Sequence, residues 1–148
     1  VISKHHQALV SFLRSHDDYC LICEDDVIFS DNALSIIHDL VQNFSFDFVD
    51  IAGGDGLTTS NADVTINKSL QLEKKSNFAT RTACCYLVSR RYAEKLSLVL
   101  RSPVFPIDWS MSFAFSLFTS SPLVYWVCNN LAEHGSSTGK VISWRSSQ

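Results

Sequence analysis

The sequence predicts one α/β domain over residues 1–148, with helices packed on a central sheet. The length of 148 residues suits a single domain, and a chain of this size buries roughly two-thirds of the surface exposed when unfolded. Hydrophobic residues make up 46% and charged residues 18%, which is typical of a globular protein. Short apolar runs alternate with segments of helical periodicity. This alternation predicts a layered, Rossmann-type fold with a mostly parallel sheet.

The first half of the chain predicts two helices and two strands. The run Tyr19–Cys23 is short and continuously apolar, as expected for a strand covered on both faces. Asp31 and Asn32 suit the start of a helix, and Leu34 and Ile37 are expected to face inward from it. In order, we expect a helix over residues 2–14, a strand over 19–23, a helix from 33 to about 41 and a strand over 46–52.

The second half continues the alternation after a polar stretch. Residues 57–77 are mixed in character and predict one exposed strand near 64–72. The tail over 133–148 is polar and rich in serine, and no linker marks a second domain. In order, we expect a strand over 82–89, a helix from 90 to about 100, an aromatic-rich helix from 108 to about 118 and a strand over 122–127.

Charge and hydropathy exclude two classes of partner. The net charge is −3 and no Lys/Arg cluster exceeds a doublet, so a nucleic-acid-binding surface is not expected. The longest apolar runs are well under the ~20 residues of a membrane span, so we expect no integral membrane segment. Peripheral membrane contact stays compatible with this composition.

Five cysteines, an odd number, lie mostly inside apolar runs. Cys20 and Cys23 have a CxxC spacing, but on a strand they point to opposite faces, which argues against a shared zinc ion. Small buried hydrophobes are the favoured interpretation, and they suit a reducing compartment. We therefore expect a cytoplasmic location, with membrane association allowed; two N-x-S sequons would instead suit the Golgi or ER lumen of a eukaryote.

The strongest chemical signal is the triplet Glu24-Asp25-Asp26, which directly follows the first apolar strand. Consecutive carboxylates beside an apolar strand are costly unless a cation meets them, and Mg²⁺ and Mn²⁺ prefer oxygen ligands. Alternation places Glu24 and Asp26 on one side and Asp25 on the other. A metal site and a solvated loop both remain open on these residues alone.

The run LICEDDV at residues 21–27 resembles the LILEDDV signature of the family 25 glycosyltransferases, the lipopolysaccharide and procollagen β-galactosyltransferases. Other stretches resemble motifs of the same family and occur in the same order over roughly residues 3–110. They are the helix segment SKHHQAL at 3–9, FVDI at 48–51, TACCYLVSRRYAEKL at 82–96 and PID at 106–108.

The resemblance implies a GT-A fold and an inverting transfer from a UDP-sugar, with Mn²⁺ or Mg²⁺ as cofactor. It implies that Glu24 and Asp26 are the metal and diphosphate residues and that Asp25 lies nearer the ribose or the sugar. The family also has an upstream strand and helix that help to hold the nucleotide base. This chain starts after the point where they would lie, and Cys84-Cys85 stand where the family has a small, Gly-containing pair.

Asp108 and Trp109 are candidates for the acceptor side of such a site. Asp108 is either a general base that deprotonates the acceptor hydroxyl or the N-cap of the helix that it begins. Trp109 is either an acceptor contact or a core residue of that helix. His5 and His6 lie on the first predicted helix, where one could face the donor site, although a surface or capping role is favoured for both.

The segment Glu133–Gly139 and the glycine-flanked Asp55 supply further candidates for the donor side. Many GT-A enzymes use a late histidine as a third metal ligand, which suits His134, and the alternative is a mobile surface loop. Ser136 and Lys140 are candidates for contacts with the diphosphate. Asp55 either contacts the sugar or occupies a turn.

These observations lead to the expectation of a metal-assisted, inverting hexosyltransferase that moves galactose or glucose from a UDP-sugar to a glycan or lipopolysaccharide acceptor. Two alternatives stay open. One is a truncated or degenerate transferase domain that acts as a non-catalytic binding module. The other is a metal-dependent phosphoryl-transfer enzyme or hydrolase that uses the same triplet for Mg²⁺.

Overall fold

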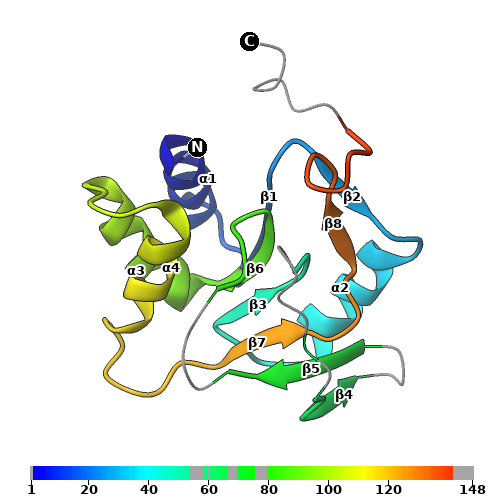
Figure 1. The fold of residues 1–148 in the computed structure, drawn as a ribbon. Coiled ribbons are helices and arrows are strands. Elements are labelled where there is room, and N and C mark those ends of the chain that lie inside the picture. Colours follow the sequence, from blue (N-terminus) through cyan, green and yellow to red (C-terminus); the bar gives the residue numbers. More distant parts are fainter. Residues whose placement is uncertain (1, 54–58, 60, 67–69, 76–79, 142–148) are drawn as a thin grey trace.

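The computed structural model describes residues 2–53, 59, 61–66, 70–75 and 80–141 (Figure 1). Helices and strands alternate over these residues as the sequence predicts, with three additional short strands. The helices are α1 (Ile2–Arg14), α2 (Ala33–Asn43), α3 (Arg90–Arg101) and α4 (Ile107–Phe115). The strands are β1 (Tyr19–Cys23), β2 (Val27–Phe29), β3 (Phe48–Asp50), β4 (Val64–Ile66), β5 (Leu70–Lys74), β6 (Cys85–Ser89), β7 (Val124–Val127) and β8 (Ala132–His134).

The main sheet has the strand order β1-β6-β3-β7-β5-β4 among the described residues. The α/β class is confirmed, but the prediction of a mostly parallel sheet is wrong, because β3·β7 is the one parallel pairing in this sheet. Continuous apolar runs report burial on both faces of a strand, which is usual in parallel sheets but is also met by an antiparallel strand that helices cover on both sides. Because β6 is antiparallel to both β1 and β3, the strands β1, β3 and β7 nevertheless run in the same direction. Their carboxyl ends therefore lie at one edge.

Helices cover both faces of the sheet, which explains the continuous apolar runs. In β6, Leu87 belongs to the core cluster that includes α2, whereas Tyr86 and Val88 belong to the cluster that includes α1, α3 and α4. Figure 1 shows the same division, with α2 on one side of the sheet and the other three helices together on the opposite side. The result is a three-layer arrangement with two apolar cores.

Helix α2 differs from its predicted orientation. Leu34 was expected to face inward, but its side chain is 62% exposed, and Ala33, Ile37 and Leu40 form the buried stripe instead. Leu34 lies about 100° around the helix from Ala33, so both cannot face the same core. Asn32 is the N-cap, as predicted, but it has a φ of 62° and makes no side-chain capping hydrogen bond.

The polar stretch after β3 contains two strands where the sequence predicted one exposed strand. β4 pairs with β5, and β5 pairs with β7 in the main sheet. Leu70 and Leu72 are buried, whereas Gln71 between them is exposed. This alternation of burial along β5 shows that one face of the strand completes the core.

A second, two-stranded sheet was not predicted. β2 directly follows the acidic triplet, and it pairs with β8 in the serine-rich region that was expected to be an irregular tail. The register sets Val27 opposite His134. This pairing brings residues that are about a hundred positions apart in the sequence together beside the carboxyl end of β1.

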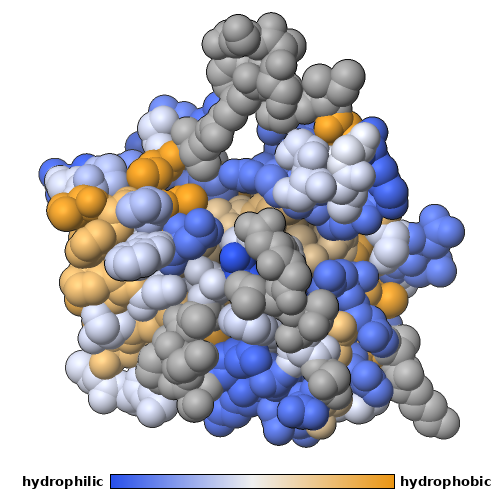
Figure 2. Space-filling model, viewed as in Figure 1, coloured by the Kyte–Doolittle hydropathy of each residue, from blue (hydrophilic) through white to orange (hydrophobic). Residues whose placement is uncertain are grey.

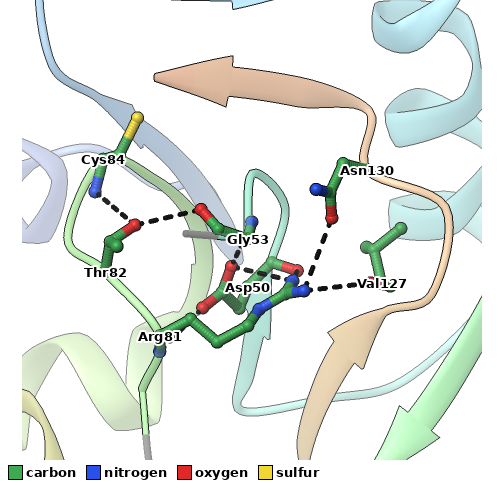
Figure 3. A network of polar contacts seen from close by, with 7 residues as sticks. All are labelled: Asp50, Gly53, Arg81, Thr82, Cys84, Val127 and Asn130. Atoms are coloured by element: carbon green, nitrogen blue, oxygen red, sulfur yellow. Dashed lines mark hydrogen bonds and ion pairs between the residues drawn. The ribbon is translucent and has the colours of Figure 1, made fainter. Parts of the chain in front are cut away.

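A buried ion pair ties the strand ends together at the same edge (Figure 3). The side chains of Asp50 and Arg81 are 0% and 1% exposed, and Arg81 Nη2 lies 3.0 Å from Asp50 Oδ1. Asp50 also accepts the backbone N–H groups of Arg81 and Gly53, both at 3.1 Å. Arg81 Nη1 donates to the carbonyl of Val127 and to Asn130 Oδ1. One guanidinium therefore links the end of β3, the end of β7 and the segment that precedes β6.

Gly53 is required at the centre of this network. Its φ is +65°, a conformation that residues with a side chain rarely adopt. A Cβ at this position would lie 2.7 Å from Asn130 Oδ1 and 2.9 Å from Arg81 Nη1, which is too close for either contact. The glycine therefore allows the turn after β3 to close against the ion pair.

Replacing Arg81 with methionine is expected to destabilise the fold by about 3–5 kcal/mol, because Asp50 would stay buried without its cation. Urea denaturation followed by circular dichroism measures this loss. Lys140→Met is the control, since its ion pair with Glu133 is exposed and contributes at most about 1 kcal/mol. Equal, small losses in the two variants would show that the buried pair does not hold the strand ends.

Candidate functional site

The acidic triplet lies in the turn that leaves β1. The N–H of Glu24 donates to the carbonyl of Cys84 at 2.8 Å, so the first residue of the triplet is still anchored to the segment that leads into β6. Glu24 is partly buried, Asp26 is buried and Asp25 is exposed. This alternation matches the prediction that Glu24 and Asp26 share one side of the chain.

His134 completes a three-residue cluster with these two carboxylates. Its Nε2 atom lies 3.0 Å from Asp26 Oδ2 and 3.7 Å from Glu24 Oε2. One ligand atom from each of Glu24, Asp26 and His134 lies within 4.8 Å of the others. His134 is the last residue of β8, so the ladder between β2 and β8 sets its position, rather than an irregular surface loop.

Gly135 allows the chain to approach the acidic turn closely. Its N–H donates to the carbonyl of Asp26 at 2.8 Å. A Cβ on Gly135 would lie 2.6 Å from that same carbonyl oxygen and 2.8 Å from Val141 Cγ2, closer than side chains tolerate. A glycine after His134 therefore lets the imidazole reach Asp26.

The surroundings keep both carboxylates of the cluster ionised. The contact with His5, reinforced by the charges of His5 and His134, holds the pKa of Glu24 below its usual value. Burial raises the pKa of Asp26, but hydrogen bonding from Ser136 and the charge of His134 outweigh burial and lower it overall. The two side chains are thus negatively charged at neutral pH.

This geometry fits a hard divalent cation. Oδ1 of Asp26 is buried and has no hydrogen-bond partner among the described residues, which leaves one lone-pair acceptor of a charged group unused. Bond lengths of about 2.0–2.1 Å to Mg²⁺ place adjacent octahedral ligands roughly 3 Å apart. The separations of 3.0 and 3.7 Å around His134 Nε2 are close to this value. Two carboxylates and an imidazole also suit Mn²⁺.

His5 supports the cluster from α1, a position that sequence reasoning did not favour. The residue is 5% exposed, although a surface or capping histidine was expected. Its Nε2 lies 3.7 Å from Glu24 Oε1, and its Nδ1 lies 2.8 Å from the hydroxyl of the fully buried Tyr86. His5 therefore connects the core beneath α1 to the acidic turn.

Asp108 belongs to the first turn of α4 and does not cap it. The N-cap is Pro106, so the interpretation of Asp108 as the cap is wrong. Oδ1 of Asp108 is buried without a hydrogen-bond partner among the described residues. Burial and the negative charge of Glu24 raise the pKa of the Asp108 carboxyl. A hydrogen bond from the backbone of Ala83 to the Asp108 carboxyl opposes this shift, and the next residue, Cys84, accepts the N–H of Glu24.

Trp109 is not a core residue, because 69% of it is exposed. Its ring centroid lies 6.5 Å from that of Phe105, and the ring of Phe105 lies 6.2 Å from that of Phe113. Both phenylalanines are also exposed. Figure 2 shows apolar surface gathered on the side of the molecule formed by α3 and α4.

The other predicted donor-side residues differ in their surroundings. Ser136 Oγ lies 3.2 Å from His134 Nε2, so it contacts the cluster directly. Lys140 is exposed and donates to Glu133. Asp55 lies outside the described residues.

No protein-family model matches the chain, and no curated protein or solved structure is significantly similar to it. Within the part of the chain that the structure describes, no helix is long and apolar enough to cross a membrane. The resemblance to the family 25 glycosyltransferases therefore stays a prediction.

We expect the protein to bind one Mn²⁺ ion at the cluster. Asp26→Asn should weaken Mn²⁺ binding at least about tenfold, because even the loss of a residue that only hydrogen-bonds to a metal ligand lowers metal affinity by about that factor. Isothermal titration at pH 7 measures the affinity. Asp31→Asn removes an equal charge from an exposed position and serves as the control. Unchanged Mn²⁺ affinity in Asp26→Asn would refute the site.

Proposed function

We propose that this protein is a metal-assisted, inverting glycosyltransferase that moves a hexose from a UDP-sugar to a glycan acceptor. The observation that carries the proposal is the cluster of Glu24, Asp26 and His134. The candidate base is Asp108, whose Oδ1 is buried without a hydrogen-bond partner among the described residues. Such a transfer needs two chemical groups: carboxylates that bind the cation, and a separate carboxylate that is basic enough to accept a proton.

A GT-A-like architecture is part of the proposal. What supports it is the common direction of β1, β3 and β7, which places the acidic turn and the turn after Asp50 at one edge of the sheet. Ligands of open α/β sheets bind beyond the carboxyl ends of such strands. β6 lies between β1 and β3 and runs in the opposite direction, but the carboxyl ends of β1 and β3 still lie at the same edge of the sheet.

On the donor side, Glu24, Asp26 and His134 would hold Mn²⁺ or Mg²⁺. When bound, the cation supplies positive charge that stabilises a departing diphosphate. Three protein ligands leave coordination positions free for phosphate oxygens. Asp25 is exposed in the same turn, and we assign it to the ribose or the sugar. Ser137 would orient His134, because its hydroxyl lies 2.8 Å from Nδ1 and leaves Nε2 for the cation. Ser136, whose hydroxyl lies 3.2 Å from Nε2, is assigned to the diphosphate.

On the acceptor side, Asp108 would accept the proton of the attacking hydroxyl. A base must lie on the face of the sugar opposite the leaving group for inversion. Asp108 comes from α4, whereas Glu24 and Asp26 come from the turn after β1 and His134 comes from the end of β8. The raised pKa makes the carboxylate a stronger base than an exposed aspartate. Trp109 adjoins it and is largely exposed, so its ring is available to the apolar face of an acceptor sugar.

With Mn²⁺ present, we expect UDP release from UDP-galactose or UDP-glucose, accelerated by a glycan acceptor. Asp26→Asn is expected to lower kcat/KM by at least about a hundredfold, because charge stabilisation at the leaving group is lost. Asp31→Asn is again the control. Turnover of a simple phosphate ester without any sugar donor would favour a phosphoryl-transfer enzyme instead, and UDP binding without turnover would favour a binding module.

Asp108→Asn is expected to lower kcat by roughly 10²–10⁴-fold while Mn²⁺ and UDP affinities stay unchanged, because only the base is removed. The raised pKa means that folding disfavours the ionised carboxyl, so stability falls as pH rises through the folded-state pKa. Asparagine removes this cost. The Tm of the variant at pH 7 should therefore equal or exceed that of the unmodified protein.

Wild-type activity should fall as the pH drops through the raised pKa of Asp108, since the base becomes protonated. A kcat–pH profile measures this limb, and differential scanning fluorimetry measures the Tm. A variant that keeps full kcat, or that unfolds at markedly lower temperature, would assign Asp108 a structural role.

A further inference from the structure

Two cysteine side chains face each other across the first pair of strands in the sheet. Cys23 ends β1 and lies opposite Cys85, the first residue of β6, and their sulfur atoms are 3.5 Å apart. Both thiols are free. The CxxC partner Cys20 instead packs with the apolar core on the opposite face of the sheet.

The position in the ladder favours a bond between these sulfurs. The next pair along is hydrogen-bonded, since the N–H of Glu24 donates to the carbonyl of Cys84. Pairs alternate in an antiparallel ladder, so Cys23 and Cys85 occupy a non-hydrogen-bonded position, where Cα atoms approach to about 4.5 Å. Disulfides span Cα separations of about 4.4–6.8 Å. Side-chain rotation alone could therefore close the gap to the ~2.05 Å of a sulfur–sulfur bond.

The two thiols differ in accessibility in the way that an oxidation site needs. Among the five cysteines, Cys23 is the exposed one, and Cys85 is 0% exposed. An oxidant in solution therefore reacts with Cys23 first, and the buried Cys85 lies within contact distance of the oxidised sulfur. Cys84 adjoins Cys85 in sequence, but it precedes β6, and the ladder register sets Cys85 opposite Cys23.

We propose that Cys23 and Cys85 form a reversible, intrachain disulfide when the protein meets a hydroperoxide. The Cys23 thiol attacks the peroxide, which breaks the O–O bond and gives the Cys23 sulfenic acid and an alcohol, or water from hydrogen peroxide. The Cys85 thiol then attacks the sulfenic sulfur, the disulfide forms, and water leaves. The peroxide is the two-electron acceptor, and a dithiol reductant reverses the modification.

The proposal does not depend on the transferase activity. Its consequence falls on the candidate metal site, because Glu24 directly follows Cys23 in the turn. A bridge to Cys85 would attach the carboxyl end of β1 covalently to β6, at the point where the acidic turn begins.

The test treats the reduced chain with hydrogen peroxide and maps its peptides by mass spectrometry without prior reduction. The chain should lose the mass of two hydrogen atoms, yield a linked pair of peptides containing Cys23 and Cys85, and regain its mass with dithiothreitol. No loss of hydrogen, or a bridge that involves Cys84 or a second chain, would overturn the proposal.

Variants separate the roles of the two thiols. In Cys85→Ala the sulfenic acid has no partner, so dimedone should label Cys23, whereas Cys23→Ser should give neither bridge nor label at that position. Cys20→Ser is the matched control and should form the bridge as the unmodified chain does. Dimedone labelling of Cys85 in Cys23→Ser would contradict the assigned order of attack. Circular dichroism checks that each variant is folded. The peptide map of the unmodified chain tests the bridge even if a variant does not fold.

Discussion

The ion pair between Asp50 and Arg81 is the interaction on which the arrangement of the site depends. Both side chains are almost completely buried, so each is tolerated only because the other is present. From this pair, hydrogen bonds lead toward the acidic turn. Thr82 Oγ1 donates to the carbonyl of Gly53 and accepts the N–H of Cys84 (Figure 3). The carbonyl of Cys84 in turn accepts the N–H of Glu24. The pair thus aligns the edge where β1 and β3 end.

A second constraint comes from the small sheet of β2 and β8, which closes the chain against the acidic turn. Without it, His134 would not meet Asp26, and the site would contain carboxylates only. The pairing of β2 with β8 costs folding free energy in one respect. It buries the charged carboxylate of Asp26, whose Oδ1 has no hydrogen-bond partner among the described residues. Proteins tolerate such unfavourable features mainly at functional sites.

The sequence predicted those features that depend on local pattern. The run Tyr19–Cys23 indicated a buried strand, helical periodicity indicated α1 and α3, and the acidic triplet marked the site. Features that depend on distant pairing were missed: neither strand direction nor the β2·β8 ladder leaves a local pattern. Arg81 was overlooked, although Asp50 at the end of an apolar strand is a signal that a buried cation is needed. His5 looked like a surface residue, because its role depends on Tyr86 and Glu24.

The central claim is that Glu24, Asp26 and His134 hold a divalent cation at the edge of the sheet. Diffraction from crystals grown with MnCl₂ and UDP, collected on both sides of the manganese absorption edge, tests it most directly. We expect one anomalous peak about 2.2 Å from a carboxylate oxygen of Glu24, a carboxylate oxygen of Asp26 and Nε2 of His134, with UDP phosphate oxygens as the remaining ligands. A peak elsewhere, or UDP bound without manganese between these side chains, would contradict it.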